Sequence, residues 1–340
     1  MIAREVLWPS DEEIIVRVAF LYVGQGESTI VLAADTGSYQ TMLVDINCDA
    51  TRHGIDVPRL MHDLLAGGSL SVFVNTHPHN DHLCGVARLS EAVQVDAVWH
   101  SGHTPGRKHE DAYRALQDLI GTVTRQGGTP EALRGSRTPR AIGEATCYTL
   151  APAAYVTDDI AGEDPERRYR RIHEHCVVLK IGHEPTWIML TGDADRDAWE
   201  HHIANYHQNH LRAAILSAPH HGSRTFFQHD EADEPYLAAL ETIAPTYVVV
   251  SAPHRGDSPH GHPHDDALER YADQVGPENI LHTGEHRYTF IADIYRDGTY
   301  AITDDKGRLA DHYGLNGNSG MGRTGPLIIT TRIDDRPMGS

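Results

Sequence analysis

The sequence predicts an α/β fold in which two mixed β-sheets pack face to face and carry helices on their outer sides. Residues 15–46 consist of short β-rich runs separated by a glycine-containing turn, which indicates a β-meander. Residues 58–125 alternate helix-like and strand-like patterns. Residues 176–302 repeat this mixture, so each half of the chain is expected to supply one sheet with its own helices, an αββα sandwich.

The first half begins with the meander, whose first turn at 23–27 contains two glycines that permit unusual φ angles. Its expected strands are 15–22, 28–32, 41–46, 71–76 and 96–99. Its expected helices are 58–66, one directly after residue 82, and one near 110–125. Two polar stretches follow: we interpret 127–143 as a loop or insertion and 154–171 as a mobile segment.

The second half has six expected strands and three expected helices. The strands are 176–181, 187–191, 213–218, 247–251, 279–283 and 288–302. The helices are near 195–207, near 233–243, and from residue 265 onward. Residues 305–340 are rich in Gly, Asp and Arg and contain one short apolar run, 327–329. We therefore expect a domain at 1–304 and a poorly ordered C-terminal tail at 305–340.

Composition narrows the functional class. The chain has 340 residues, 40% hydrophobic residues and a net charge of −19, which disfavours a protein that coats long nucleic acids or anionic membranes. No run approaches the roughly 18 apolar residues of a membrane span, and no signal peptide is visible. Four scattered cysteines fit a reducing compartment, so we expect a cytoplasmic protein without membrane contact.

The most informative stretch is 75–82, which contains the pattern T-H-x-H-x-D-H. It follows an apolar strand and contributes His77, His79, Asp81 and His82, a ligand set suited to Zn²⁺ or a similar ion. The spacing of His77 and His79 directs both rings to one side of an extended segment. Asp81 and His82 then point to a second position close by. The pattern predicts two adjacent divalent cations, Zn or Mn.

The alternative is a histidine-rich loop that binds nothing, or a simple zinc-binding tract, since the chain has 25 histidines. Neither alternative explains why an apolar strand leads directly into the cluster. The metal-site interpretation is therefore preferred.

Further ligand candidates lie where other strands end. Asp193 follows the strand at 187–191, and His220 follows the strand at 213–218; Asp193 is expected to bridge the ions and His220 to bind the second one. Taken singly, Asp193 also fits a helix N-cap and His220 a hydrogen-bonded loop residue. For a third imidazole on the first ion, His173 and His175 are both candidates, and His175 is favoured.

One similar turn is set aside. His103 lies in a Gly- and Pro-containing segment that looks like a metal-ligand turn, but it follows the neighbouring strand too closely. We interpret His103 as a loop residue.

Taken together, these stretches resemble the metallo-β-lactamase superfamily, and within it the soluble hydrolase domain of ComEC-type DNA-uptake proteins and their free-standing relatives. The resemblance covers roughly residues 15–300. It is carried, in the family's order, by 20–27, Asp45, the T-H-x-H-x-D-H pattern, Leu190-Thr191-Gly192-Asp193, Ala218-Pro219-His220-His221-Gly222-Ser223 and Gly261-His262-Pro263-His264.

The resemblance implies roles for individual residues. Metal ligands would be His77, His79, Asp81, His82, Asp193 and His220. Asp45 would orient the histidine loop, and His262 would border the active site. The chain departs from the family in two places: Ile46-Asn47 stands where Thr-Gly is usual, and His173 stands where relatives often carry Asn. The membrane channel of the uptake proteins has no counterpart here.

The expected activity is metal-dependent hydrolysis of a phosphodiester in nucleic acid or a nucleotide, through a metal-activated water. Asp81 would position the nucleophile, while His221 or His262 would donate a proton or hold a phosphate oxygen, and Ser223 would help to anchor the anion. The charge balance favours a strand end or single strand over extended duplex. Two alternatives stay open: hydrolysis of a lactone, lactam or thioester on the same scaffold, and a purely structural metal site.

Overall fold

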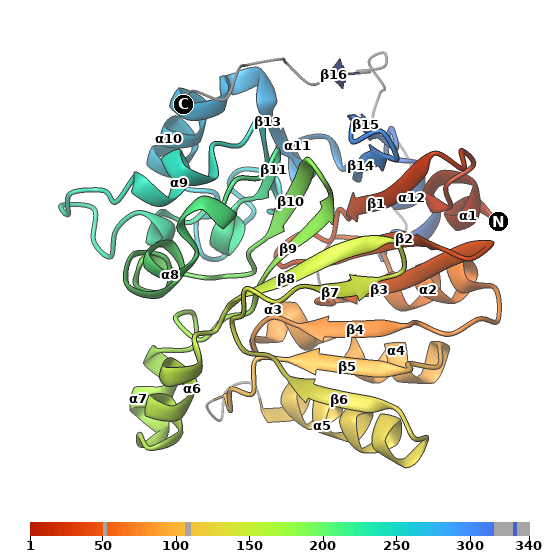
Figure 1. Ribbon diagram of the computed structural model, residues 1–340, viewed down its shortest axis with the longest axis horizontal. Helices are drawn as coiled ribbons and strands as arrows, with labels where there is room; N and C mark the ends of the chain where they lie inside the picture. Colours follow the sequence, from red (N-terminus) through yellow and green to blue (C-terminus); the bar gives the residue numbers. More distant parts are fainter. Residues whose placement is uncertain (50–52, 106–109, 316–328, 332–340) are drawn as a thin grey trace.

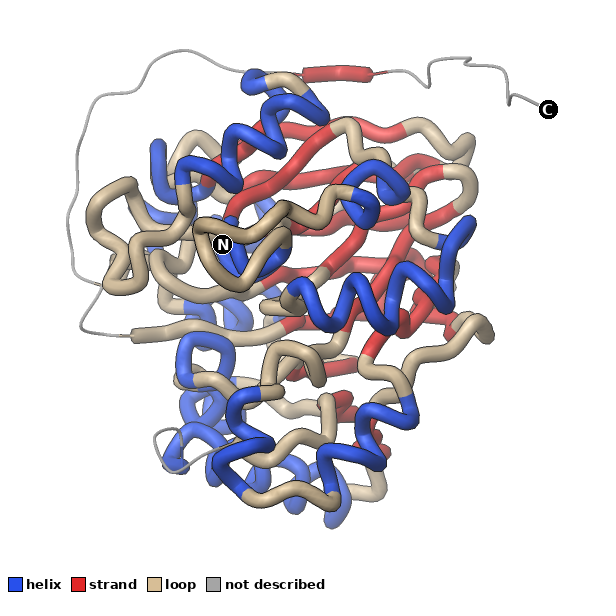
Figure 2. The backbone as a smooth tube through the Cα atoms, turned by 90° about the vertical axis from the view of Figure 1, so that its left-hand side faces the viewer, coloured by secondary structure: helices blue, strands red, loops and turns tan. Residues whose placement is uncertain are grey.

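A computed structural model describes residues 1–49, 53–105, 110–315 and 329–331. It contains two mixed β-sheets, one of nine and one of seven strands, with helices on the outer face of each (Figure 1). In the side view the strands lie between helices (Figure 2). The predicted αββα sandwich is therefore confirmed.

The first sheet has the strand order β16-β15-β14-β1-β2-β3-β4-β5-β6. Pairing is antiparallel from β16 to β3, which includes the meander expected at 15–46, and parallel from β3 to β6. Its strands are β1 (Ile14–Phe20), β2 (Thr29–Asp35), β3 (Ser38–Val44), β4 (Val72–Asn75), β5 (Ala97–His100), β6 (Thr129–Ala132), β14 (Phe290–Tyr295), β15 (Tyr300–Asp304) and β16 (Ile329–Thr331).

The second sheet has the order β13-β12-β11-β10-β9-β8-β7. Pairing is antiparallel from β7 to β10 and parallel from β10 to β13. Its strands are β7 (Arg140–Ile142), β8 (Ala145–Ala151), β9 (Val178–His183), β10 (Thr186–Leu190), β11 (Ile215–Ser217), β12 (Tyr247–Val250) and β13 (Ile280–His282).

Helices connect the parallel strands and cover the two outer faces. Those in the first half are α1 (Ile2–Leu7), α2 (Val57–Leu65), α3 (Asn80–Leu83), α4 (Val86–Ala92), α5 (Glu110–Arg125), α6 (Ala154–Ala161) and α7 (Pro165–Arg170). Those in the second half are η2 (Ala198–Ile203), α8 (Ala204–His207), η3 (Gln208–His210), η4 (Pro219–Gly222), η5 (Arg224–Phe226), α9 (Ala238–Ile243), α10 (Asp265–Val275), η6 (Pro277–Asn279), α11 (Thr283–His286) and α12 (Arg308–Tyr313). Among the described residues, none of these helices combines the length and the apolar character of a membrane span.

The core has three layers of buried side chains. The middle layer joins the inner faces of both sheets, with Phe20, Val74 and Ile188 among its members. One outer layer packs α2, α4 and α5 against the first sheet, and the other packs η2, α9 and α10 against the second. Because each sheet is covered on both faces, the strands are nearly continuous apolar runs, which is why they are recognisable in the sequence.

Two stretches differ from the expectation. Residues 127–143, predicted as a loop, contain β6 and β7, which are edge strands of the two sheets. Their side chains are partly exposed and do not alternate clearly, so the pairing with a neighbouring strand defines them. Residues 154–171, predicted as mobile, form α6 and α7, which project from the two-sheet body (Figure 1).

The start of the predicted tail belongs to the folded domain. Helix α12 buries Leu309 and Tyr313 against the first outer layer, and the Tyr313 hydroxyl donates to the Asp63 carboxylate at 2.9 Å. Strand β16 adds to the edge of the first sheet beside β15. The boundary expected at 304 is thus placed too early, because α12 buries apolar side chains that the polar composition hides. Residues 316–328 and 332–340, with most of the predicted apolar run, lie outside the described residues.

Candidate metal centre

The predicted ligands gather where five strands of the two sheets end. Because β3 and β4 run parallel, and β10, β11 and β12 do too, their carboxyl ends lie at common sheet edges. Loops from these ends place the candidate groups, in order Asp45 after β3, His77 to His82 after β4, Asp193 after β10, His220 and His221 after β11, and His262 in the loop after β12. The crevice at the carboxyl ends of strands is where α/β sheets commonly bind ligands.

The first group of possible ligands contains three imidazoles and one carboxylate, His77, His79, His173 and Asp193. One ligand atom from each lies within 4.8 Å of the others. The His77 Nε2 is 3.5 Å from Asp193 Oδ2, and the ring of His220 stands 4.3 Å from that of His173. This donor set suits a borderline ion such as Zn²⁺.

The second group contains Asp81, His82 and His221, whose ligand atoms also lie within 4.8 Å of one another. Asp81 and His82 are in the single turn of α3, directly after the first two histidines. The His221 Nε2 is 3.3 Å from the His82 Nε2 and 3.6 Å from Asp81 Oδ2. Two lone-pair nitrogens and a carboxylate therefore point to one position.

Asp193 stands between the two groups. Its Oδ2 is 3.5 Å from both His77 Nε2 and His220 Nε2, on the side of the first group. Its Oδ1 is 3.1 Å from His82 Nε2 and 3.4 Å from His221 Nε2, on the side of the second. One carboxylate thus offers one oxygen to each group, which is the arrangement of a bridging ligand.

The Asp45 carboxylate accepts hydrogen bonds from the histidine loop at 75–82. It is fully buried, and its Oδ2 accepts the Nδ1–H of His82 at 2.7 Å, which leaves the His82 Nε2 with a free lone pair. Its Oδ1 accepts the backbone N–H of Thr76 at 2.7 Å and the side-chain N–H of Asn75 at 3.2 Å. The hydrogen bond from His82 to Asp45 fixes the tautomer and orientation of a candidate metal ligand.

His220 and His221 occupy consecutive left-handed backbone positions, with φ of 51° and 57°. Such strain in non-glycine residues occurs at functional sites, where the surrounding structure holds it. The His221 Nδ1–H donates to the Ser251 carbonyl at 3.0 Å, and the His220 Nδ1 hydrogen bonds with the Thr225 hydroxyl at 2.8 Å. Both rings therefore present Nε2 to Asp193.

The donor atoms fit a pair of cations. Among the described residues, His77 Nε2 and Asp193 Oδ1 are buried polar atoms without a hydrogen-bond partner, although such atoms normally have one. A cation between the ring nitrogens and the carboxylate would satisfy both. Neutral imidazole and ionised carboxylate are the forms that bind metal.

The electrostatics of the site follow from burial and close charges. Burial, together with the neighbouring His82, lowers the pKa of His77 well below its usual value, so His77 offers a lone pair. Burial alone would raise the pKa of Asp193, but the charges of His82 and His220 outweigh it and keep that pKa well below normal. For His82, burial is outweighed by Asp193 and Asp45, which raise its pKa well above normal. The surplus of negative charge around His82 attracts a proton or a metal cation.

The structure corrects the third imidazole of the first group. His173 Nε2 lies 3.2 Å from His79 Nδ1, whereas His175, the favoured candidate, points elsewhere. The His175 Nε2 hydrogen bonds with the Thr157 hydroxyl of α6 at 2.8 Å, and its Nδ1 lies 3.3 Å from that of His103. Because the chain turns between 171 and 176, positions 173 and 175 face different neighbours. His103 is a loop residue outside both groups, as expected.

His220, predicted as a ligand of the second ion, belongs to neither group of ligand atoms. Its Nε2 lies 3.5 Å from Asp193 Oδ2, and its ring lies 4.3 Å from that of His173. Its neighbour His221 belongs to the second group. The ring of His262 packs 5.0 Å from that of His220, at the border of the site. Ser223 is buried, and its hydroxyl accepts the Thr225 N–H at the start of η5; its expected role in anchoring an anion stays a prediction.

Sequence reasoning assigned no role to Glu27. This carboxylate is buried, and its Oε1 accepts the Ser217 hydroxyl at 2.9 Å, while a ligand atom of Glu27 lies within 4.8 Å of Asp45 and His82. Burial and the adjacent Asp45 raise its pKa to about 7. The only signal in the sequence is the V-G-Q-G-E turn itself, which carries part of the family resemblance.

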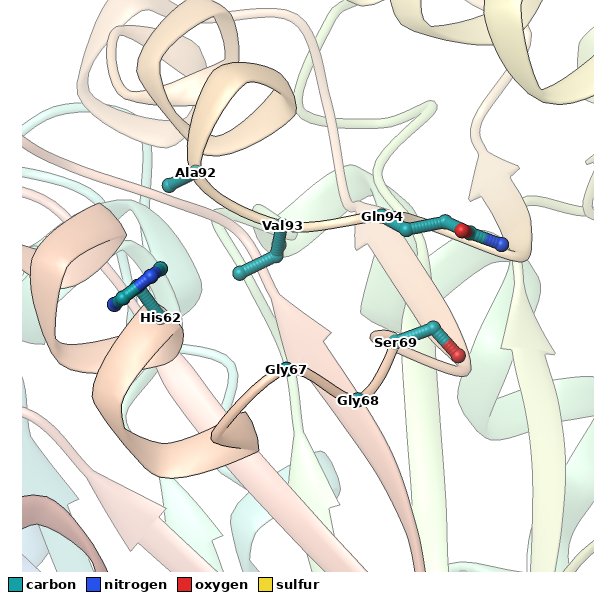
Figure 3. A pocket seen from close by; sticks show the side chains of 7 residues that line it. All are labelled: His62, Gly67, Gly68, Ser69, Ala92, Val93 and Gln94. Atoms are coloured by element: carbon teal, nitrogen blue, oxygen red, sulfur yellow. The ribbon is translucent and has the colours of Figure 1, made fainter.

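A separate cavity of about 190 Å³ lies near the amino end of β4, away from the carboxyl ends that carry the candidate ligands (Figure 3). It contains none of those ligands. Its lining residues are His62, Gly67, Gly68, Ser69, Ala92, Val93 and Gln94.

No protein-family model and no curated protein matches the chain. Solved structures similar to it include a diphosphatase of the PhnP family, with 14% identity, a TM-score of 0.40 and coverage of 79% of this chain and 95% of the other. Igni18, a metallo hydrolase from the archaeon Ignicoccus hospitalis, has 11% identity, a TM-score of 0.42 and coverage of 81% and 98%. A β-lactamase domain protein from Burkholderia ambifaria has 14% identity, a TM-score of 0.30 and coverage of 55% of each chain. Because each likeness is distant, the function proposed below rests on the geometry of the site.

Proposed function

We propose that this chain is a two-metal hydrolase of the metallo-β-lactamase type that cleaves phosphodiesters in nucleic acid or nucleotides. The observation that carries the proposal is the position of Asp193, with one oxygen toward each of two groups of buried ligands. A structural zinc site needs only one closed set of four ligands. Two groups that share a carboxylate are typical of hydrolytic two-metal centres.

The first cation would be held by His77, His79 and His173, the second by Asp81, His82 and His221, with Asp193 between them. The contacts of His220 place it next to the first group. When bound, Zn²⁺ or Mn²⁺ would supply hydroxide at neutral pH and positive charge to stabilise the leaving oxygen.

The side chains of the protein perform the remaining tasks. Asp81 has the most accessible carboxylate of the ligand set, with 28% of its side chain exposed, so it can orient an attacking water through a hydrogen bond. His262 packs against His220 at the border of the site, and its buried Nδ1 has no hydrogen-bond partner among the described residues. These contacts support a role for its ring in holding or protonating a substrate oxygen.

The substrate class follows from charge. With a net charge of −19, the chain attracts phosphate only where bound cations reverse the local field. We therefore propose that the phosphodiester is presented at an end or in a single strand, with few phosphate contacts and a shallow dependence of affinity on salt. A phosphodiester is proposed over a lactone, lactam or thioester because the P-H-H-G-S and G-H-P stretches at 219–223 and 261–263 carry the resemblance to hydrolases of DNA-uptake proteins.

The test combines metal analysis with a panel of substrates. Purified protein is analysed for transition metals and assayed against single-stranded DNA, duplex ends, closed circular duplex, RNA, cyclic nucleotides, a lactam and a lactone. We expect about two metals per chain and fastest cleavage of a single strand or a strand end. Cleavage of a lactone or lactam with no phosphodiester cut would replace this function by the alternative hydrolase. Absence of bound transition metal and of activation by Zn²⁺ or Mn²⁺ would remove the two-metal assignment.

A further inference from the structure

The turn between β1 and β2 approaches the second group of ligands, and a ligand atom of its residue Glu27 lies within 4.8 Å of His82 and Asp45. Its residues Gln25 and Glu27 are polar, yet only 5% and 3% exposed. Burial of polar side chains is costly unless each one is hydrogen bonded. The contacts of Gln25, Gly26 and Glu27 therefore indicate what the turn does.

Glu27 contacts the loop that carries the second group. Its backbone N–H donates to the Asp81 carbonyl at 3.4 Å, and its carboxylate accepts the Ser217 hydroxyl at 2.9 Å. Ser217 is the last residue of β11, three residues before His220. Glu27 thus joins the end of β11 to α3.

Gly26 reaches His221 through one intermediate residue. The Ser251 hydroxyl donates to the Gly26 carbonyl at 2.9 Å, and the Ser251 carbonyl accepts the His221 Nδ1–H at 3.0 Å. Glycine is required here, because φ is +124° and an added Cβ would lie 2.4 Å from the Asp81 carbonyl oxygen. The turn therefore approaches α3 as closely as a bare backbone allows.

Gln25 reaches the loop of His262. Its Oε1 accepts the Ser258 hydroxyl at 2.8 Å, and the Ser258 Oγ accepts the backbone N–H of His262 at 3.0 Å. The turn itself is held in place by Asn47, whose side-chain N–H groups donate to the carbonyls of Val23 and Gln25. Three successive residues thus connect to three different parts of the site.

We infer that the Gln25–Glu27 turn is a positioning element that sets the second cation's ligands and the His262 loop independently. Gly26 acts through Ser251 on His221, and Gln25 acts through Ser258 on His262. The inference rests on the proposed function for its cation and substrate readouts, but the placement of the loops can be measured without either. The side-chain hydrogen bonds described above connect the turn to Ser217, Ser251 and Ser258, which lie at the end of β11 and in the loop after β12.

The experiment separates the two arms of the turn with Ser251→Ala and Gln25→Ala. Each variant has a matched control at an exposed position, Ser90→Ala and Gln117→Ala. Zn²⁺ and Mn²⁺ are titrated into chelator-treated protein by calorimetry, and KM and kcat are measured with the preferred phosphodiester. Hydrogen–deuterium exchange is followed at 218–224 and 258–264 in protein without added metal.

We expect Ser251→Ala to lower the affinity for the second cation about tenfold, as for other groups that orient a metal ligand. The affinity for the first cation should stay within about twofold of the wild-type value. Gln25→Ala should leave both cation affinities unchanged and raise KM several-fold. Exchange should accelerate at 218–224 in the first variant and at 258–264 in the second, and the controls should match wild type.

Equal weakening of both cations by either variant, with a parallel fall in melting temperature, would show that the turn only supports the core and would overturn the inference. Wild-type exchange in both segments would also overturn it. If the wild type binds no cation or cleaves no phosphodiester, the proposed function fails, and the exchange data alone still decide the role of the turn.

Discussion

The two groups of ligands differ in how firmly the protein holds them. In the second group the Nδ1 of each histidine, the ring nitrogen that faces away from Asp193, has a hydrogen-bond partner. For His82 the partner is the Asp45 carboxylate, at 2.7 Å, and for His221 it is the Ser251 carbonyl, at 3.0 Å. In the first group, the partners of the His77 Nδ1 among the described residues are the Thr76 hydroxyl, at 3.2 Å, and the Cys176 sulfur, at 3.7 Å. The second group is thus oriented before a cation arrives.

The groups also differ in donor chemistry. The first has three imidazoles, which suit Zn²⁺. The second includes the Asp81 carboxylate, and its His82 is hydrogen bonded to the Asp45 carboxylate, a setting more tolerant of Mn²⁺. The difference teaches that the two proposed cations, which would share Asp193, need not be equivalent in affinity or identity. The following predictions test this inequality, from the largest expected effect to the smallest.

Asp193→Asn should affect both cations alike, because it replaces the carboxylate that both groups share by a weaker, neutral ligand. We expect loss of both cations and a fall in hydrolysis on the order of 10³-fold or more. Elemental analysis and turnover measurements, with circular dichroism as a check of the fold, provide the test. Retention of one tightly bound metal would show that Asp193 belongs to a single group.

Asp81→Ala and His173→Ala should each remove one cation and leave the other. Asp81 belongs to the second group and His173 to the first, so each variant should retain about one metal per chain and lose most hydrolysis with little change in fold. Calorimetric titration with Zn²⁺ and Mn²⁺ identifies which site remains. His175→Ala is the matched control, since its ring contacts Thr157, and it should retain both metals. A folded Asp81→Ala protein with near-wild-type turnover would refute the role of that carboxylate.

Asp45→Asn tests the orientation of the second group. The amide can no longer accept the His82 proton with a full negative charge, so we expect a loss of about 10–100-fold in second-cation affinity. Thr225→Val removes the neutral hydroxyl that hydrogen bonds with His220, and it should reduce cation affinity by a smaller factor. Equal effects in the two variants would contradict the special role of a charged partner.

Glu174→Gln tests the segment that carries His173 and should give the smallest effect. Burial would raise the pKa of Glu174, but hydrogen bonds from Arg171 and His202 outweigh it and lower the pKa to about 2. Because its pKa is lowered, Glu174 contributes its full stabilisation of the fold at pH values above its ordinary pKa of 4.5. This contribution is lost as the pH falls toward 2.

We therefore expect Glu174→Gln to lower the melting temperature by about 2 °C or more at pH 7 and by progressively less below pH 4.5. Thermal unfolding of both proteins across this range gives the comparison. A gap that does not change with pH would contradict the ionic contribution of Glu174.

Much of this centre was predictable because its parts are local. His77, His79, Asp81 and His82 lie within six residues directly after an apolar strand, so spacing alone brings them to one sheet edge. Asp193 and His220 also follow apolar strands, and the ends of parallel strands meet whatever the details of packing. The same reasoning predicted the two sheets, because strands buried on both faces are recognisable as apolar runs.

The choice between neighbours required the tertiary structure. His173 and His175 have the same chemistry and flanks, and only the turn at 171–176 and the hydroxyl of Thr157 decide which ring meets His79. The left-handed backbone of His220 and His221 likewise directs each ring to a different oxygen of Asp193.

Edge strands β6 and β7 and helices α6, α7 and α12 escaped sequence analysis for a related reason. β6 and β7 are partly exposed, and α7 is largely charged. Helix α6 buries only Val156 and Ile160, and α12 has only a few buried side chains, so periodicity carries little information about these elements. The sequence by itself determined the strand-end chemistry and the layered fold, since both depend on short-range pattern and burial. Long-range backbone pairing and the packing of individual rings decided the rest, because those contacts join residues that no local pattern relates.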